Sequence, residues 1–288
     1  MSVPAAFDYH TANTVDEAVE LLQRYGDSAK VLAGGHSLIP TMKLRLSQPE
    51  HLIDIGRIPN LSYIREENGV IAVGAMTTYT QLARSELLRQ HFALLTDAAS
   101  VLGDQQVRNR GTLGGSIAHS DPAGDMPAIV LALKAEIITQ RPNGKRAIAA
   151  DDFFVDTFET ALQPDELLTE IRFSIPPTRT GSAYMKFENK ASHYAVTGCA
   201  AVISLQPDDT CTAASIAITG ASNKTTRASA TEAALVGQKI NEGVAAEAAS
   251  HAVEGLDLIE DIHGSKAYRS QMTIVMARRA ILKAVERA

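Results

Sequence analysis

Cysteine and tryptophan are scarce in this sequence of 288 residues, which has two Cys and no Trp. An iron–sulfur cluster needs about four thiolate ligands at characteristic short spacings, so this chain holds no cluster of its own. Cys199 and Cys211 lie in stretches that we predict to be buried strands. Because free cysteine is among the most buried residue types, we expect both to be small core residues.

Positive charge is also limited, since 27 Lys and Arg face 33 Asp and Glu, which gives a formal net charge of −6. There is no basic stripe of the kind that neutralises nucleic-acid phosphates, so nucleic acid is not an expected partner. No apolar run reaches the roughly 18 residues that would span a bilayer. The N-terminus, MSVPAAFDYH, lacks the basic and apolar segments of a secretory signal. We therefore expect a cytoplasmic protein.

The sequence does contain enough apolar residues, 45% of the total, to bury the cores of about two compact domains. Thr14 and Glu17 form a capping-box signature for a helix that stops at Gly26. Asn-Gly pairs at 68–69 and 143–144 are typical of tight β-hairpins. Further elements are predicted as strands over 30–33, 51–55 and 167–175, hairpins over 63–76 and 136–149, and helices over 82–88, 92–102 and 125–133.

A change in the pattern follows residue 175, where Pro176-Pro177 and Thr180-Gly181 predict a linker. Beyond it, apolar runs predict three strands, and helical spacing predicts a long final helix. These elements are expected at 183–187, 195–205, 213–219 and 266–287. We therefore expect a first domain over 1–177, with subdomains of about 1–57 and 58–177, and a second domain over 178–288.

Two glycine-rich motifs carry the chemical signal, AGGHS at 33–37 and TLGGS at 112–116. Successive backbone N–H groups that point into one concavity bind a pyrophosphate, and this geometry requires residues free to adopt positive φ. The glycine pairs provide that freedom, and Ser37, Thr112 and Ser116 add hydroxyl groups. One Gly-Gly after a strand is more often a simple turn. Two such motifs flanked by hydroxyls favour a nucleotide.

The type of nucleotide is narrowed by the motifs that are missing. There is no G-x-x-x-x-G-K-[ST] for an ATP or GTP P-loop, and no G-x-G-x-x-G opening a helix for a Rossmann NAD site. A stand-alone flavin oxidase and a non-catalytic nucleotide-binding module remain alternatives at this point. The spacing of the motifs alone leaves the ligand open.

Three segments carry a resemblance to a known family, LAGGHSLIPTMKLRLSQPEHLIDI at 32–55, VRNRGTLGGSIAHSDPAGDMPA at 107–128 and DELLTEIRFSIP at 165–176. In order and spacing they resemble the FAD-binding medium subunits of molybdenum hydroxylases, within which the carbon monoxide dehydrogenase group is most similar. The resemblance extends over essentially the full length. It implies an α+β fold, with a two-part FAD-binding region of the vanillyl-alcohol-oxidase type followed by a flavoprotein domain of three strands and helices.

The same resemblance implies a place in electron transfer. Electrons would leave a molybdopterin cytosine dinucleotide centre on a large subunit, cross two [2Fe–2S] clusters on a small subunit, and reach FAD on this chain. The flavin would pass them to an external acceptor. The assembly implied is a dimer of heterotrimers, and carbon monoxide is the favoured substrate of the holoenzyme, with nicotine-like N-heterocycles, purines or aldehydes as alternatives.

Carried over position by position, the resemblance implies that both glycine motifs hold the pyrophosphate of FAD. Asp125 would hydrogen-bond the nucleotide, Leu168 would cover part of it, Lys186 would contact the flavin side, and Tyr194 would stack on the isoalloxazine ring. The full set of expected contacts is Ala33, Gly34, Gly35, His36, Ser37, Leu102, Thr112, Leu113, Gly114, Gly115, Ser116, Asp125, Leu168, Lys186 and Tyr194.

The roles of Asp125, Lys186 and Tyr194 each have a simpler structural alternative. Asp125 would serve equally as a helix cap, Lys186 as a solvated surface charge, and Tyr194 as a core or interface residue. Ser116 stands where many relatives have Asn, and His36 stands where many N-heterocycle hydroxylases have Gln. We expect His36 to be neither a catalytic base nor a covalent flavin attachment site.

Two clusters of acidic residues invite a different chemistry. His119, Asp121 and Asp125 are the raw material of a metal site, but they straddle a loop and a helix start, so convergence on one ion is not expected. Asp151-Asp152 is expected to be a turn and not an acid–base pair.

Overall fold

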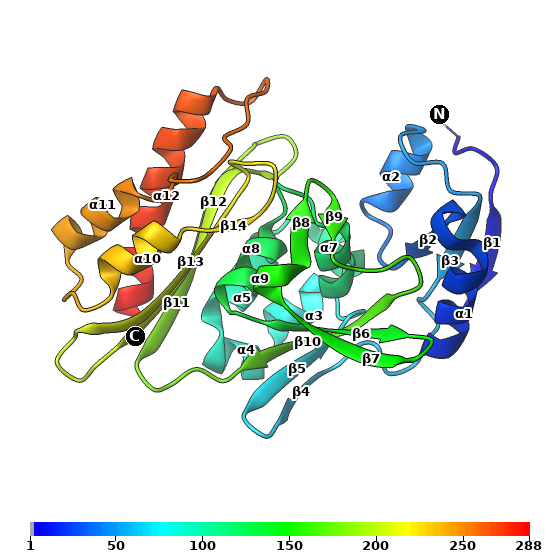
Figure 1. The fold of residues 1–288 in the computed structure, drawn as a ribbon, viewed down its shortest axis with the longest axis horizontal. Coiled ribbons are helices and arrows are strands. Elements are labelled where there is room, and N and C mark those ends of the chain that lie inside the picture. Colours follow the sequence, from blue (N-terminus) through cyan, green and yellow to red (C-terminus); the bar gives the residue numbers. More distant parts are fainter. Residues whose placement is uncertain (1–2) are drawn as a thin grey trace.

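The protein, described here from a computed structural model covering residues 3–288, begins with a small parallel sheet of strand order β1-β3-β2 (Figure 1). Thr14 caps the first helix by accepting from the Glu17 amide, as predicted. The elements of this unit are β1 (Asp8–Thr11), α1 (Val15–Tyr25), η1 (Gly26–Ser28), β2 (Ala29–Leu32), α2 (Leu38–Lys43) and β3 (His51–Asp54).

A proline such as Pro40 is expected to break regular structure, but in this chain it lies within helix α2. The proline stands in the first turn of the helix, where backbone N–H groups have no partner within the helix and its missing donor costs nothing. The helix therefore starts immediately after the first glycine motif.

The middle of the chain forms a five-stranded antiparallel sheet of order β4-β5-β10-β6-β7. Both predicted hairpins are confirmed, and Asn68 and Gly69 have φ of 53° and 78°, as a tight turn of this kind requires. The strands are β4 (Ile64–Glu67), β5 (Val70–Gly74), β6 (Glu136–Arg141), β7 (Gly144–Ala149) and β10 (Leu167–Ser174), with a separate two-stranded ribbon of β8 (Phe154–Asp156) and β9 (Glu159–Thr160).

Helices cover one face of this sheet. The single helix predicted over 82–88 is wrong, because Ser85 has an extended backbone and caps a new helix by accepting from Leu88 N. The run 103–111 also contains a helix, which Asp104 caps. The helices are α3 (Tyr79–Arg84), α4 (Glu86–His91), α5 (Ala93–Val101), α6 (Gln105–Arg110), α7 (Leu113–His119), α8 (Asp125–Ala132) and α9 (Ala150–Phe153).

The last part is an antiparallel sheet of order β11-β12-β13-β14, with helices packed on one face (Figure 1). The expected three strands are joined by a fourth of two residues. Its elements are β11 (Thr180–Glu188), β12 (Ala195–Leu205), β13 (Cys211–Thr219), β14 (Thr226–Arg227), α10 (Ser229–Leu235), α11 (Glu242–Ser250) and α12 (Lys266–Glu286).

Thr180-Gly181 lies in β11 and not in the predicted linker. An added Cβ at Gly181 would stand 1.9 Å from the Ala284 carbonyl oxygen. Glycine is therefore needed here because the end of α12 packs directly on the strand, which is a contact that sequence reasoning could not see.

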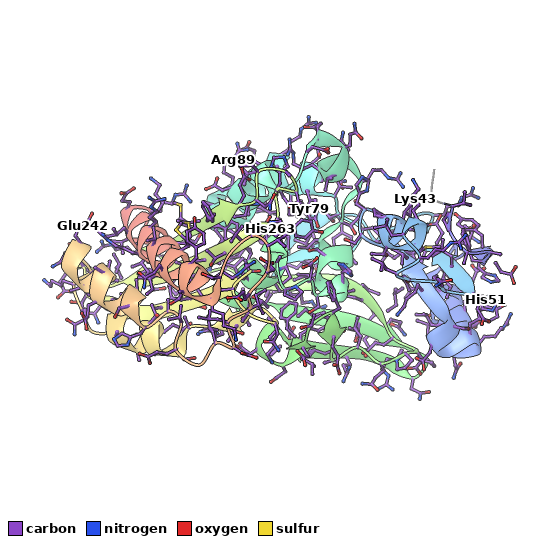
Figure 2. All side chains as sticks on the ribbon, turned by 90° about the horizontal axis from the view of Figure 1, so that it is seen from above. Lys43, His51, Tyr79, Arg89, Glu242 and His263 are labelled. Atoms are coloured by element: carbon purple, nitrogen blue, oxygen red, sulfur yellow. The ribbon has the colours of Figure 1, made fainter. Side chains whose placement is uncertain are left out.

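The α+β prediction is confirmed by the separate sheets and the helices packed on them, which enclose three hydrophobic cores. One core lies in the N-terminal unit, and one lies between the last sheet and its helices. The largest is shared by the middle sheet, helices such as α5 and α8, and residues Ala200 and Ala217 of the last sheet. Figure 2 shows the resulting elongated shape, with His51 at one end and Glu242 at the other.

Cys199 and Cys211 are 0% and 1% exposed, as expected. Within residues 3–288, no helix has the length and apolar character needed to cross a membrane.

Candidate functional site

The two glycine motifs, far apart in the sequence, meet in the structure. A Cβ on Gly34 would stand 2.2 Å from the carbonyl oxygen of Arg110, just before the second motif, and a Cβ on Gly115 would stand 3.6 Å from the Cβ of Ala33. The first motif connects β2 to α2, and the second begins α7. The contact joins the N-terminal unit to the helices of the middle sheet.

The first motif has the geometry of an anion cradle. Gly35 has φ of 76°, and within residues 3–288 the backbone N–H groups of Gly34, Gly35, His36 and Ser37 find no hydrogen-bond acceptor. The His36 ring lies with Nδ1 3.1 Å from the Gly34 carbonyl oxygen. Four consecutive amides without a partner at a partly exposed turn fit the recognition of a phosphate group.

The second motif works differently, and the prediction that Gly114 and Gly115 repeat the positive-φ loop is wrong. Both lie in the first turn of α7, where Thr112 Oγ1 accepts from Gly115 N at 3.2 Å and Gly114 N donates to the Ala75 carbonyl at 2.9 Å. A Cβ on Gly114 would stand 2.5 Å from the Ala75 Cβ. These glycines permit close packing of α7 on the end of β5, and the Ser116 hydroxyl of the motif lies beside Tyr79.

Asp125 begins α8 and is buried at 5% exposure. It does not cap the helix, because Gly124 occupies the N-cap and the Asp125 carboxylate turns to the last sheet. Its Oδ1 accepts from the Tyr184 hydroxyl at 2.5 Å, and its Oδ2 accepts from Lys186 Nζ at 2.9 Å. Burial raises the pKa of Asp125, and the Lys186 ammonium opposes that rise.

Lys186 is not a solvated surface charge, since its side chain is 5% exposed. Its ammonium also donates to the His193 carbonyl at 3.0 Å, next to Tyr194. Tyr194 is 43% exposed and so lies outside the core. Partial burial raises the pKa of Tyr194, whereas the Ser37 hydroxyl lowers it. Tyr194 therefore stands beside the first glycine motif.

The predicted leucine contacts are more deeply placed. Leu168 and Leu113 are 4% and 0% exposed and belong to the largest core. Leu102 is partly buried at the end of α5 and packs against the same core. The side chains of these leucines are therefore engaged in core packing.

Tyr79 is a candidate site residue that the sequence did not reveal. It is 6% exposed, and a Cβ on Gly111 would stand 2.5 Å from its ring. Burial raises the pKa of Tyr79, and the neighbouring Ser116 hydroxyl lowers it. The sequence signals the helix cap at Thr78, but nothing local places the next ring beneath the second glycine motif. Tyr184 was missed for a similar reason.

The candidate metal cluster does not assemble. His119 and Asp121 approach to 4.0 Å, whereas Asp125 points to Lys186. Across residues 3–288, no group of three or more His, Cys, Asp and Glu side chains is arranged to hold a metal ion. The predicted turn at Asp151-Asp152 is wrong, because both residues lie in α9 and Asp151 pairs with Arg227 at 3.1 Å.

A cleft of about 480 Å³ lies elsewhere, on the outer face of the middle sheet. It is lined by side chains such as Arg65, Glu170 and Arg172, which alternate along the strands with core residues such as Ile171 and so point to the opposite face. This cleft is separate from the glycine motifs.

Comparison with known proteins agrees with this geometry. Residues 5–177 match the model of the FAD binding domain in molybdopterin dehydrogenase, and residues 182–284 match that of the CO dehydrogenase flavoprotein C-terminal domain. The chain belongs to the family of FAD-binding medium subunits of molybdenum hydroxylases. The predicted family is thereby confirmed, and the chain is a flavoprotein component of a molybdenum- and FAD-dependent oxidoreductase.

Individual relatives of this flavoprotein span its full length. It is 41% identical over 279 residues to the carbon monoxide dehydrogenase medium chain of Hydrogenophaga pseudoflava, with 97% of each chain covered. It is 37% identical to the 6-hydroxypseudooxynicotine dehydrogenase complex subunit alpha of Paenarthrobacter nicotinovorans, covering 99% and 96% of the two chains. A solved carbon monoxide dehydrogenase from Hydrogenophaga pseudoflava superposes with a TM-score of 0.96 at 43% identity over 99% of both chains.

Proposed function

We propose that this chain is the FAD-binding electron-transfer subunit of a heterotrimeric molybdenum hydroxylase. The observation that carries the proposal is the row of four unpartnered amides from Gly34 to Ser37, held against the chain that enters the second glycine motif. Such a cradle suits the pyrophosphate of a dinucleotide. Bound FAD would supply the redox chemistry, while the chain binds and orients it.

The roles of individual residues follow from their positions. The amides of the first motif would donate to phosphate oxygens, and the hydroxyls of Ser37 and Ser116 would add further donors. Lys186, already paired with Asp125 at 2.9 Å, would present a fixed positive charge at the flavin side. Tyr194 would lie against the isoalloxazine ring from the neighbouring loop.

The remaining sequence-based contacts keep lesser roles. Thr112 would fix the start of α7 through its bond to Gly115 N, and His36 would shape the first motif. Leu102 and Leu168 would border the nucleotide through packing. The division into an FAD-binding part over 1–177 and a second domain over 178–288 belongs to the same proposal.

The partners proposed are a large subunit with molybdopterin cytosine dinucleotide and a small subunit with two [2Fe–2S] clusters, assembled as a dimer of heterotrimers. Carbon monoxide is the favoured substrate, because a carbon monoxide dehydrogenase medium chain is among the full-length relatives and the first motif, His36 included, resembles that of the carbon monoxide group. N-heterocycle, purine and aldehyde dehydrogenases are the alternatives. In each case the substrate would react on the large subunit.

The test begins with an absorption spectrum of the chain, purified alone and after co-expression with its neighbouring genes. We expect flavin absorbance, FAD released by heat, and iron and molybdenum only in the co-purified complex. A colourless protein, even with its partners present, would refute the flavin assignment and favour a non-catalytic nucleotide-binding module. Flavin without co-purifying partners would instead favour a stand-alone flavin oxidase.

A further inference from the structure

The segment 189–194 between β11 and β12, here called the Tyr194 loop, is tightly built. Asn189 Oδ1 accepts from the amides of Ala191 and Ser192 at 2.8 and 3.2 Å. The backbone closes on itself, since Asn189 N donates to the Tyr194 carbonyl at 2.9 Å. His193 adopts φ of 60°, a left-handed conformation that costs a side-chain-bearing residue energy. The conformation of the loop is therefore specified by its own hydrogen bonds.

One fastening of this loop comes from the cofactor side. Lys186 Nζ bridges the Asp125 carboxylate at 2.9 Å and the His193 carbonyl at 3.0 Å. Because Asp125 begins α8, this bridge ties the loop to the unit that carries the glycine motifs. It acts at the end of the loop nearest Tyr194.

A second fastening reaches the opposite end of the loop. Asn189 Nδ2 lies 2.9 Å from His263 Nδ1, which belongs to the segment ahead of α12 (His263 is labelled in Figure 2). Asp261 holds this segment in shape, accepting from His263 N at 2.8 Å and from the Arg269 guanidinium at 2.6 Å.

The contact with His263 is supported by a buried residue of the C-terminal part. Arg269 is 3% exposed, and its NH1 group also donates to the Gly220 carbonyl at 2.7 Å. The contact with His263 therefore joins Asn189 to a rigid part of the domain, although His263 itself is exposed and Asn189 is half-buried.

We propose that Asn189 and His263 are positioning residues that hold Tyr194 over the flavin and so govern which oxidants reach it. The inference rests on the proposed function, since it needs a flavin beside Ser37. Tyr194 is 43% exposed, so core packing does not fix its ring. With the His263 contact removed, the loop keeps its internal hydrogen bonds and the Lys186 bridge but loses its contact with the segment ahead of α12, and we expect the ring to spend more time away from the site.

The experiment uses the complex as co-purified with its FAD. His263→Ala removes the acceptor, and His263→Gln restores an oxygen that can accept from Asn189. His251→Ala is the matched control, because this histidine lies in the turn after α11 and pairs with Glu254, not with the Tyr194 loop. Tyr194→Ala gives the reference values of both measurements for a complex without the tyrosine ring.

Two measurements report the position of the Tyr194 ring and not the overall stability of the protein. Tyrosine stacking quenches flavin fluorescence, so His263→Ala should raise the fluorescence per bound FAD about twofold to fivefold, toward the Tyr194→Ala value. After anaerobic reduction with dithionite, reoxidation by a bulky dye should become about fivefold faster, with a smaller change for dioxygen. His263→Gln should recover most of the wild-type behaviour, and His251→Ala should match wild type.

The double variant of His263→Ala with Tyr194→Ala should equal Tyr194→Ala alone. Unchanged fluorescence and reoxidation in His263→Ala with full FAD content would overturn the positioning role. An effect of His263→Ala that persists in the Tyr194→Ala background would also overturn it, as would loss of FAD in His263→Ala with retention in Tyr194→Ala. Absence of FAD from the wild-type complex would instead refute the proposed function itself.

Discussion

Lys186 and Asp125 form an ion pair of 2.9 Å in which each side chain is 5% exposed. Lys186 belongs to β11 and Asp125 to α8, so the pair connects the last sheet to the helices of the middle unit. Tyr184, two residues before Lys186, binds the second carboxylate oxygen from the same face of the strand. The carboxylate is therefore paired and hydrogen-bonded as a buried charge must be.

Removal of the lysine charge should show how much the ion pair contributes to the free energy of unfolding. Lys186→Met leaves the buried carboxylate without its cation, and breaking a buried pair in this way destabilises a protein by about 3 kcal/mol or more. Urea unfolding followed by circular dichroism measures the change. Lys190→Met is the control, because it removes an exposed pair with Glu188 at 3.4 Å that is worth roughly 1 kcal/mol or less. Equal effects of the two substitutions would contradict the prediction.

The contact between the glycine motifs makes a second prediction. Gly34→Ala places a Cβ 2.2 Å from the Arg110 carbonyl oxygen, and backbone on both sides must separate. We expect a loss of about 1–3 kcal/mol in stability, as for other overpacked sites, and at least a tenfold weaker FAD affinity, equivalent to about 1.4 kcal/mol. Thermal unfolding and flavin titration of the apoprotein measure the two.

The matched control for this substitution is Gly243→Ala. It lies in α11, where the added carbon would meet only the Asn241 side-chain oxygen, at 3.3 Å. Stability and FAD affinity should stay close to wild type. If Gly34→Ala behaves like Gly243→Ala, the contact between the two motifs can accommodate an added Cβ, and the prediction is wrong.

Tyr79 supplies a third prediction. Tyr79→Phe removes the hydroxyl near Ser116 and leaves the ring packed on Gly111. Loss of this hydrogen bond, worth about 1 kcal/mol, predicts a melting temperature lower by about 2 °C and, because Ser116 is then less well oriented, roughly fivefold weaker FAD binding. Tyr63→Phe is the control, since its hydroxyl binds Glu170 on the far side of the sheet.

A double-variant cycle separates the routes by which Tyr79 acts. If Tyr79 acts by orienting Ser116, then Tyr79→Phe should have no further effect in the Ser116→Ala protein. Additive losses would mean that the two hydroxyls act independently. Unaltered FAD affinity in both single variants would remove Tyr79 from the site.

Sequence patterns predicted the helices and turns that are determined by residues close together in the sequence. The Asn-Gly hairpins follow from backbone preferences of two adjacent residues, and the Thr14 cap follows from a contact three residues away. The α7 helix did not follow from such signals, because Gly114 is poor in helix propensity. Its conformation is determined by packing on Ala75, a contact that local sequence does not encode.

In the candidate site, too, some features follow from local sequence and others depend on distant contacts. The positive-φ turn at Gly35 could be predicted from its residue types, and the structure agrees. The commitment of Asp125 to Lys186 and Tyr184 depends on how α8 meets the last sheet, about 60 residues further along the chain. The sequence predicted Asp125 and Lys186 as site residues but gave no sign that they bind each other.

His119 gives a prediction in pH. Burial lowers its pKa from 6.5, and Asp121 partly opposes this. The unfolded chain therefore takes up the proton first as pH falls, so this group's contribution to stability is full above about pH 6.5 and declines below it. His119→Gln cannot take up the proton, so the stability gap between wild type and variant should shrink from pH 7.5 to pH 5.

His251→Gln should show the opposite trend in the same urea-unfolding series. The Glu254 hydrogen bond raises the pKa of His251, so the folded state keeps its proton longer than the unfolded chain does. That contribution is full below about pH 6.5 and is lost as pH rises through the folded-state pKa. The two gaps should therefore change in opposite directions between pH 5 and 8. A constant gap for His119→Gln over this range would mean that its ring is solvated in the native protein.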